Sequence, residues 1–424
     1  MPHVDIIGLG ADGPAGLKPE LIQRIHHADF LAGGERHFRD FPSARGVRFI
    51  LKNNLDTLLT ELQTRLAEQH CVVLASGDPL FYGIGTYLSE RLGPESVRIH
   101  PAVSSMQLAF ARAGISWQDA ALASIHGRDL RATLLPLLGQ RVIGLFTDDG
   151  GSPAAVARFF LERGLVDYEA IVSENLGSEQ ECVNRFAELR HLPDKRLASL
   201  NFLILRSTRE PRDHVEVQSR RNLCPGIPDD AFARPENRQL VMTRQEVRSV
   251  LLGKMGPVQP GGMVWDIGAG LGTVSVEFAI LHPAVEVLAV ERDPERAAFA
   301  KLNRERFGAY NMRVLEGGAP AVLVAEAEQP GIVFIGGSGG DLAALLDFVG
   351  ERLRPGGRLL ANFVTLEHVS LILQWLRECG WPFEVTEIAV ARSDCLAGLT
   401  GLKPQRHVFL VRAEKAKEPN GLRG

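Results

Sequence analysis

The sequence is poor in cysteine and contains no long apolar run. Its 424 residues include five cysteines, which are scattered and never stand in C-x-x-C spacing. This distribution argues against a disulfide framework and a zinc site, and no H-E-x-x-H motif occurs. No apolar stretch approaches the ~20 residues that a membrane-spanning helix requires, and the first residues lack the form of a signal peptide. We therefore expect reduced thiols, no metal centre and a cytoplasmic protein outside the membrane.

A strong charge of either sign is also missing. The formal net charge is -4, which gives no general attraction to polyanions, so binding of nucleic acid would need a local basic patch. Apolar residues make up 45% of the chain and charged residues 23%, as in ordinary globular proteins. The length fits two domains of roughly 200 residues each.

A glycine-rich loop in the second half is the most informative stretch. An apolar run ends in Asp266, glycines follow at positions 268, 270 and 272, and a helix-like run begins at Thr273. This pattern predicts a strand, a tight turn and a helix that let the backbone approach a nucleotide closely. The G-x-G-x-G spacing differs from the dinucleotide fingerprint and favours S-adenosylmethionine (SAM). A second apolar run ends in Glu291, whose carboxylate can accept hydrogen bonds from both ribose hydroxyls.

Strand-like and helix-like segments alternate along both halves. In the second half this alternation predicts a mostly parallel sheet covered by helices, and two closing apolar runs without a helix, 383–391 and 407–411, predict an antiparallel edge. Residues 207–226 carry many charges and chain breakers without periodicity, which indicates a linker. We therefore expect domains at 1–206 and 227–424.

Two polar loops in the first half follow predicted strands. The strand 71–75 runs into Ser76-Gly-Asp-Pro79, and open α/β sheets bind ligands at such strand ends. Ser104 and Ser105 stand between a predicted strand and a predicted helix, so both can face the same crevice. Simpler roles exist for these residues, because Asp before Pro forms turns and Ser caps helices.

Five motifs in the second half carry a resemblance to a known family. They are Gly226-Ile-Pro-Asp-Asp-Ala-Phe232, Thr243-Arg-Gln-Glu-Val-Arg248, Asp266-Ile-Gly-Ala-Gly-Leu-Gly272, Glu316-Gly-Gly-Ala-Pro320 and Gly336-Gly-Ser-Gly-Gly340. Together they resemble the decarboxylating C15-methyltransferases of cobalamin biosynthesis, which are class I SAM enzymes with a Rossmann-like fold. The resemblance implies SAM contacts at Thr243, Gly268, Ala269, Gly270, Leu271, Gly272, Glu291 and Ala319. Gly318 departs from the family, because relatives commonly carry Asp there.

The first half resembles a different family. Gly77-Asp-Pro79, Tyr82-Gly83, Pro101, Ser104-Ser105 and Glu174-Asn-Leu-Gly177 are similar to motifs of the tetrapyrrole methylase superfamily, in the branch that methylates C5 of the corrin precursor. The resemblance implies a two-lobed α/β fold with a SAM site near Gly77, Asp78, Pro79, Ser104 and Ser105. The opening loop Gly8-Leu-Gly-Ala-Asp-Gly-Pro14 departs from the common Gly-x-Gly-Pro-Gly form.

Fused in this order, the halves resemble the bifunctional methyltransferases that act at both positions. The resemblance implies methylation of a reduced precorrin-6 at C5 and C15, with loss of the ring C acetate carboxyl as CO2, to give precorrin-8. It implies one SAM per domain and a homo-oligomer. A nucleophilic meso carbon needs alignment with the SAM methyl more than acid or base help, so we expect positioning to dominate.

Several further residues are candidates for contact with such a substrate. Its carboxylates would suit arginines in loop-like stretches, although most such arginines are simply solvated; the candidates are Arg36, Arg39, Arg128, Arg238 and Arg392. The glycines between 336 and 340 would let a bulky ring approach a strand end. Asn362 and Glu367, placed just beyond the last parallel strand, are weak catalytic candidates, and a helix-start role fits Glu367 equally well.

Two other functions stay open at the level of sequence. An RNA or protein methyltransferase could carry the same cofactor motifs, although the sequence lacks a basic patch interleaved with aromatic residues. A SAM-binding regulatory module without catalysis is the third possibility.

Overall fold

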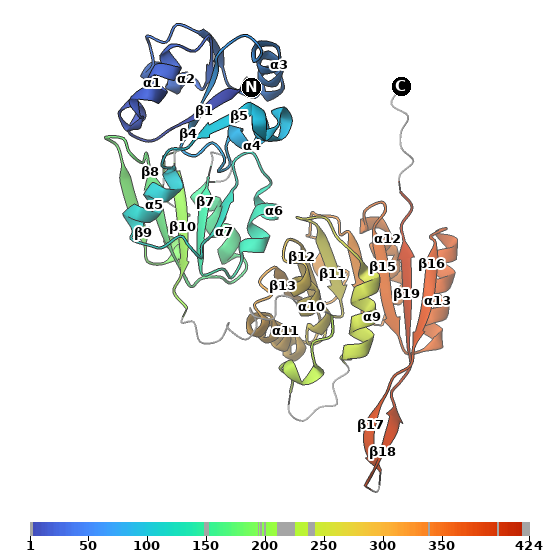
Figure 1. Ribbon diagram of the computed structural model, residues 1–424. Helices are drawn as coiled ribbons and strands as arrows, with labels where there is room; N and C mark the ends of the chain where they lie inside the picture. Colours follow the sequence, from blue (N-terminus) through green and yellow to red (C-terminus); the bar gives the residue numbers. More distant parts are fainter. Residues whose placement is uncertain are drawn as a thin grey trace. The chain divides into compact units, whose positions relative to one another are not determined.

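The computed structural model consists of two compact units (Figure 1). The first comprises residues 1–128, 140–159 and 166–208, and the second comprises residues 129–139, 160–165 and 209–424. The structure describes residues 3–147, 152–193, 195, 197–198, 201–209, 225–235, 242–337, 340–396 and 398–417. Within these ranges, no helix has both the length and the apolar character needed to cross a membrane.

The first sheet of the first unit is parallel throughout. Its strands are β1 (Val4–Leu9), β2 (Phe30–Gly33), β3 (Val47–Ile50), β4 (Cys71–Ser76) and β5 (Val97–His100), in the order β3-β2-β4-β1-β5. Helices α1 (Pro19–His26), α2 (Glu35–Asp40), α3 (Leu55–Arg65) and α4 (Ile84–Leu92) connect them. In β4, Val73 and Leu74 pack into separate apolar clusters. Burial on both faces explains why this strand is a continuous apolar run.

The second sheet of the first unit is mainly antiparallel. It contains β6 (Ala121–Ser124), β7 (Val142–Phe146), β8 (Tyr168–Glu174), β9 (Cys182–Phe186) and β10 (Asn201–Ser207), in the order β6-β7-β10-β8-β9. Only the β6–β7 pair among these strands is parallel. Helix α5 (Ser105–Ala113) packs Met106 and Phe110 against Phe202 and Ile204 of β10. Two sheets in one unit confirm the two-lobed α/β fold.

Several short strands of the first unit were not predicted. Strands β2, β3 and β6 have four residues each, too few to show a period, and β3 is mostly exposed. The prediction that Arg36 and Arg39 lie in a loop is wrong, because both belong to α2. The other described α-helices before residue 209 are α6 (Leu130–Leu134) and α7 (Pro153–Leu161).

The second unit is built on a seven-stranded sheet. Its strands are β11 (Met263–Ile267), β12 (Glu286–Glu291), β13 (Met312–Glu316), β14 (Ile332–Ile335), β15 (Arg358–Phe363), β16 (Phe383–Ile388) and β19 (Val408–Glu414). The order is β13-β12-β11-β14-β15-β19-β16. The first five strands are parallel, and β19 is antiparallel to both β15 and β16. The Rossmann-like sheet and its antiparallel edge are therefore confirmed.

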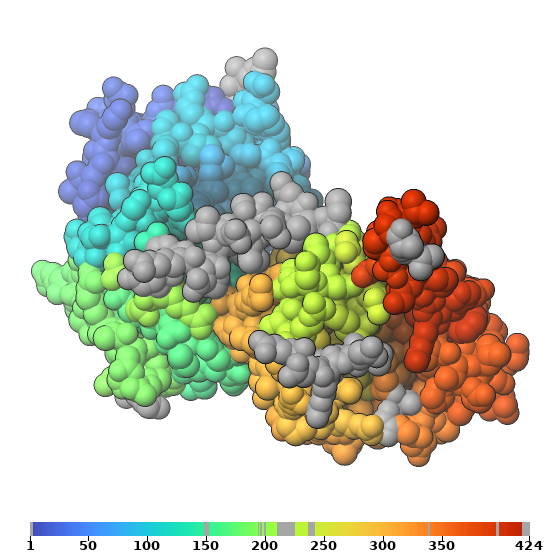
Figure 2. Space-filling view, turned by 90° about the horizontal axis from the view of Figure 1, so that it is seen from below, coloured from blue at the N-terminus to red at the C-terminus, as the bar shows by residue number. Residues whose placement is uncertain are grey.

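Helices cover both faces of this sheet. They are α9 (Gln245–Met255), α10 (Thr273–Leu281), α11 (Pro294–Phe307), α12 (Leu342–Arg352) and α13 (Leu366–Glu378). Side chains of β11 alternate between the faces: Val264 joins a cluster with Phe278 of α10, and Trp265 joins another with Leu346 of α12. Helix α9 lies beside the closing strand, where Arg412 Nε donates to the Lys254 carbonyl at 3.1 Å. On the face drawn in Figure 2, the yellow-green residues that include α9 lie next to red residues from the last part of the chain.

A buried ion pair ties α9 to α10. Arg248 is fully buried, and its Nε donates to Glu277 Oε2 at 2.5 Å. Glu277 is 2% exposed and also accepts a hydrogen bond from the Ile227 backbone N–H at 3.3 Å. Because both charges are removed from water, neither can lose its partner without a large penalty.

A two-stranded ribbon, β17 (Ala391–Leu396) and β18 (Leu399–Pro404), extends away from the sheet between β16 and β19 (Figure 1). The sequence did not predict it. Arg392, expected in a loop as a substrate contact, lies in β17 instead and is engaged by protein carboxylates. Its Nε donates to Glu246 Oε1 at 2.8 Å, and its Nη2 donates to Asp229 Oδ2 at 2.9 Å.

Candidate functional site

The glycine loop of the second unit depends on left-handed backbone at three positions. Gly268, Gly270 and Gly272 have φ angles of +78°, +58° and +72°. A Cβ on Gly268 would lie 2.6 Å from the Gly337 backbone nitrogen, so a side chain there would collide with the loop after β14. A Cβ on Gly270 would meet no atom within 4 Å. The middle glycine therefore borders open space, which is where a ligand can approach the backbone.

Glu291 holds this loop from the end of β12. The side chain is 4% exposed, and its Oε2 accepts a hydrogen bond from the Gly270 N–H at 2.7 Å, while Oε1 accepts from the Asp293 N–H at 3.0 Å. Each carboxylate oxygen has two acceptor directions, so one on each stays available for a hydroxyl. The geometry fits the predicted ribose contact and shows a second role in fixing the loop.

Asp266, the acid ahead of the glycines, is 1% exposed at the end of β11. Ser275 Oγ donates to its Oδ2 at 2.5 Å, but its buried Oδ1 has no hydrogen-bond partner among the described atoms. The pKa of this carboxyl is raised to about 7, mainly by burial and less by the negative charge of Glu291, against the lowering effect of the Ser275 hydrogen bond. Ser275 was not singled out in the sequence, because a serine inside a helical run gives no signal.

The loops that follow neighbouring strands meet at this edge of the sheet. Gly317 N–H donates to the Glu291 carbonyl at 2.9 Å, which places the predicted 316–320 loop beside β12. Gly336 N–H donates to the Ile267 carbonyl at 2.8 Å, which places the predicted 336–340 loop beside β11; residues 338 and 339 lie outside the described residues. The carboxyl ends of parallel strands are where such sheets bind ligands.

The other predicted SAM contacts differ in their surroundings. Ala269 and Ala319 are partly buried, whereas the Leu271 side chain is 2% exposed and belongs to the core, so only its backbone could reach a ligand. Thr243 precedes α9, and its carbonyl accepts a hydrogen bond from Arg248 Nη1 at 2.6 Å. Gly318 has open space where a side chain would stand.

The two weak catalytic candidates lie differently from expectation. Asn362 is inside β15 rather than beyond it, opposite Leu410, and its Oδ1 is buried without a partner among the described atoms. Glu367 is exposed in the first turn of α13, where an acid stabilises the helix dipole. The helix-start role is thus the simpler explanation for Glu367.

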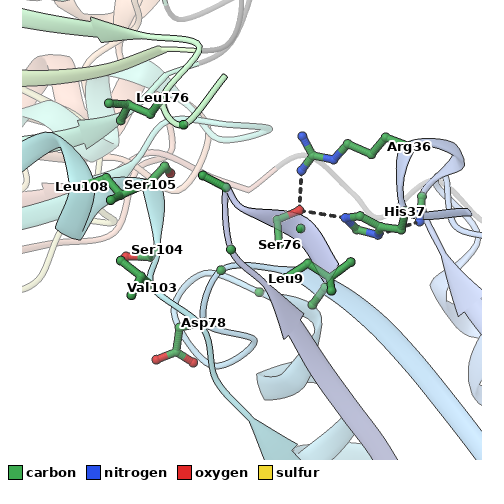
Figure 3. Close-up of a pocket in the computed structure, with 18 of the residues that line it drawn as sticks. Leu9, Arg36, His37, Ser76, Asp78, Val103, Ser104, Ser105, Leu108 and Leu176 are labelled. Carbon is green, nitrogen blue, oxygen red and sulfur yellow. Dashed lines mark hydrogen bonds between the residues drawn. The ribbon is translucent and has the colours of Figure 1, made fainter. Parts of the chain in front are cut away.

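The first unit contains a pocket of about 1010 Å³. Four of the predicted residues, Gly77, Asp78, Ser104 and Ser105, line it (Figure 3). Pro79 does not: it is buried, and its carbonyl accepts from the Gly85 N–H at 2.8 Å. The expectation that both serines face one crevice is confirmed.

Gly77 joins three strand ends at this pocket. Its φ is +62°, and an added Cβ would lie 2.9 Å from Ser104 Cα. Its N–H donates to the Leu9 carbonyl at 2.7 Å, and its carbonyl accepts from the Ala102 N–H at 3.2 Å. The loops after β4, β1 and β5 are thereby fixed together, and only glycine fits between them.

Asp78 and Ser104 line the pocket and also fill the simpler structural roles considered for them, turn formation and helix capping. Asp78 Oδ1 accepts from the Leu80 N–H at 2.9 Å, which is a turn contact. Ser104 Oγ accepts from the Gln107 N–H at 3.3 Å, and Gln107 Oε1 accepts from the Ser104 N–H at 2.9 Å, which forms a capping box for α5.

A polar cluster at the pocket was missed in the sequence. Arg36 Nη2 donates to Ser76 Oγ, and His37 Nε2 lies 3.1 Å from the same oxygen (Figure 3). Burial, with a smaller contribution from the Arg36 charge, lowers the pKa of His37 to about 4. Arg36 and Arg39 both line the pocket, as the substrate-contact hypothesis requires. Arg128 instead lies over the Tyr82 ring at 5.1 Å, and Arg238 lies outside the described residues.

Comparison with known proteins assigns the two halves separately. Residues 3–190 match the family described as Tetrapyrrole (Corrin/Porphyrin) Methylases, and residues 235–415 match the Precorrin methyltransferase domain. A cobalt-precorrin-7 C(5)-methyltransferase of Salmonella typhimurium is 40% identical and aligns with 42% of this chain and 88% of its own. A cobalt-precorrin-6B C(15)-methyltransferase (decarboxylating) of the same organism is 36% identical over 44% of this chain and 95% of its own.

Relatives that span both halves are also found. A precorrin-6Y C(5,15)-methyltransferase (decarboxylating) of Sinorhizobium sp is 34% identical over 95% of this chain and 94% of its own. The similarity therefore includes the order of the two units as well as the motifs in each. The chain belongs to the precorrin-6Y C(5,15)-methyltransferase (decarboxylating) family of SAM-dependent enzymes in cobalamin biosynthesis.

Proposed function

We propose that the first unit methylates C5 of the corrin precursor, and that the second methylates C15 and removes the ring C acetate carboxyl as CO2. The substrate is a reduced precorrin-6 and the product is precorrin-8. The observation that carries this division is that residues 3–190 match the tetrapyrrole methylases and residues 235–415 match the precorrin methyltransferase domain. A C5 enzyme and a decarboxylating C15 enzyme also exist as separate relatives, each aligning with less than half of this chain.

Each unit would bind its own SAM, which supplies an electrophilic methyl on a sulfonium. In the second unit the open side of Gly270 and the acceptor directions of Glu291 suit a nucleoside. In the first unit the ligand would contact the pocket residues Gly77, Asp78, Ser104 and Ser105, with Pro79 as support behind them. These groups hold and orient the reactants, and alignment of the two reacting carbons supplies much of the acceleration.

The decarboxylation follows from the electronic structure of the substrate. Loss of CO2 leaves an electron pair that the conjugated ring system can accept, so the macrocycle itself serves as the electron sink. The role that this leaves for the second unit is to hold the ring in position and exclude water. Asn362, with its buried and unpartnered Oδ1, is the residue that we would test first for contact with the ring.

Mass spectrometry of the product from the intact chain tests this proposal. The wild-type protein should add two methyls and remove one CO2. Gly77→Ala forces a Cβ to within 2.9 Å of Ser104 Cα and should inactivate the first unit. Its product should be heavier than the substrate by one methyl and lighter by CO2. Glu291→Ala should leave the CO2 in place. Retention of CO2 by folded Gly77→Ala, or loss of CO2 with Glu291→Ala, would contradict the division.

Three further expectations belong to the same proposal. The domain limits at 1–206 and 227–424 agree in outline with the two family matches, 3–190 and 235–415. A homo-oligomer is predicted from the family resemblance, and a cytoplasmic location is an expectation from the amino-acid sequence. Light scattering coupled to size-exclusion chromatography tests the assembly: a single species of monomer mass would refute it.

A further inference from the structure

The polar cluster of Arg36, His37 and Ser76 lies outside the motifs that identify the family. Ser76 is the last residue of β4, and its side chain is exposed to the pocket. Arg36 and His37 reach it from α2, on the side of the pocket opposite Ser104 and Ser105 (Figure 3). Arg36 also lines the pocket, and no described carboxylate lies within ion-pair distance of it.

The hydrogen-bond pattern fixes the tautomer of His37. The Gly34 backbone N–H donates to His37 Nδ1 at 3.3 Å, so Nδ1 acts as an acceptor and carries no proton. His37 is 8% exposed, and its low pKa keeps the ring neutral near pH 7. A neutral imidazole with a bare Nδ1 carries its proton on Nε2, which therefore donates to Ser76 Oγ.

In this arrangement the Ser76 hydroxyl can still donate one hydrogen bond. A hydroxyl has two acceptor lone pairs and one donor proton. Arg36 Nη2–H and His37 Nε2–H occupy both acceptor positions. The Ser76 proton has no described acceptor in the protein, so it is available only to a molecule in the pocket.

We propose that Ser76 and Arg36 together form a receptor for one carboxylate of a bound ligand, and that His37 positions the Ser76 hydroxyl. The receptor rests on the function proposed above. The carboxylate belongs either to the methionine part of SAM or to an acid side chain of the tetrapyrrole. Asp12, Asp40 and Asp78 also line the pocket and would repel an anion, so the carboxylate needs the positive charge of Arg36 beside the Ser76 hydroxyl.

Equilibrium titrations of the intact chain test the receptor without requiring turnover. Binding of S-adenosylhomocysteine is followed by calorimetry, and binding of cobalt-precorrin-7 and its metal-free counterpart by absorbance. Ser76→Ala should weaken binding of one of the two kinds of ligand, S-adenosylhomocysteine or tetrapyrrole, at one class of site by roughly ten- to a hundredfold, as expected for a hydrogen bond to a charged group. The ligand that is weakened identifies the source of the carboxylate.

Two matched variants separate the hydroxyl from the fold. Ser76→Thr keeps the hydroxyl and should restore most of the affinity. Ser116→Ala removes a hydroxyl from an exposed turn outside the pocket and should change neither titration. Affinities of Ser76→Ala within twofold of wild type for every ligand would overturn the receptor, and so would a Ser76→Thr variant that binds no better than Ser76→Ala.

The positioning role of His37 has its own readout. If His37 acts only by orienting the Ser76 hydroxyl, then His37→Ala and the double variant with Ser76→Ala should both bind the ligand as weakly as Ser76→Ala alone. A further loss in the double variant would assign His37 a structural role instead. Failure of wild-type protein to methylate C5 would refute the proposed function, whereas the titrations judge the receptor independently.

Discussion

Replacement of Asp266 by asparagine should change how the stability of the second unit depends on pH. The carboxyl has a pKa raised from 3.8 to about 7 because burial penalises its charged form. The folded state therefore holds a proton that the unfolded state releases above pH ~4. Its contribution to stability is present below the unfolded pKa and is lost as the pH rises through about 7.

The size of the effect follows from the shift. One pKa unit corresponds to about 1.4 kcal/mol, so between pH 5 and pH 8 this single group should cost wild-type protein roughly 2 to 3 kcal/mol of stability. The amide of the Asp266→Asn variant cannot ionise, so the variant avoids this loss. The free energy of unfolding of Asp266→Asn, relative to wild type, should therefore rise by the same amount over that pH range.

Urea unfolding at pH 5 and pH 8 measures this difference. Three of the four tryptophans, Trp265, Trp375 and Trp381, belong to the second unit, so tryptophan fluorescence reports mainly on that unit. Asp230→Asn, at an exposed position, is the control and should show no such pH dependence. A stability difference between Asp266→Asn and wild type that is equal at both pH values would refute the reasoning.

Three other substitutions test separate parts of the structure. Gly268→Ala should lower the unfolding free energy of the second unit by clearly more than Gly270→Ala, because only Gly268→Ala places a Cβ against backbone atoms. Gly270→Ala should cost about 1 kcal/mol because of the left-handed φ of Gly270. Equal losses of the two variants in urea unfolding would contradict this. Arg248→Met leaves the buried Glu277 charge without its cation and should cost about 3 to 5 kcal/mol in the same assay; a loss below about 1 kcal/mol would refute that role. Ser104→Ala removes the cap of α5 and should cost about 1 kcal/mol, measured by thermal unfolding of the first unit, and an unchanged melting temperature would contradict the capping role.

The second unit was the more predictable of the two. Its apolar strands alternate regularly with helical segments, and the glycine loop is recognisable because few residues other than glycine adopt left-handed backbone. The sequence did not predict the ribbon β17–β18, because its exposed strands show no alternation of apolar and polar residues. Strands β2 and β6 were also missed, because their four residues show no clear alternation of apolar and polar side chains.

At the candidate sites, the sequence predicted the positions where the backbone conformation requires a particular residue type. Gly77 and Gly268 are set by close contacts that exclude a side chain, so their motif spacing carried the information. Partnerships between side chains distant in sequence could not be read in this way. Ser76 meets His37, 39 positions earlier, and Arg392 meets Asp229, 163 positions earlier, only because the sheets bring them together.

The chain enters the ribbon from β16 and returns from it to β19, and the two strand ends are paired with each other in the seven-stranded sheet. Ile388 of β16 and Val408 of β19 lie opposite each other, so the register of these strands does not depend on how many residues stand between them. Evolution or an engineer can therefore lengthen, shorten or replace the outer part of the ribbon without disturbing its neighbours. The inner part has less freedom, because Arg392 is anchored to Glu246 at the start of α9.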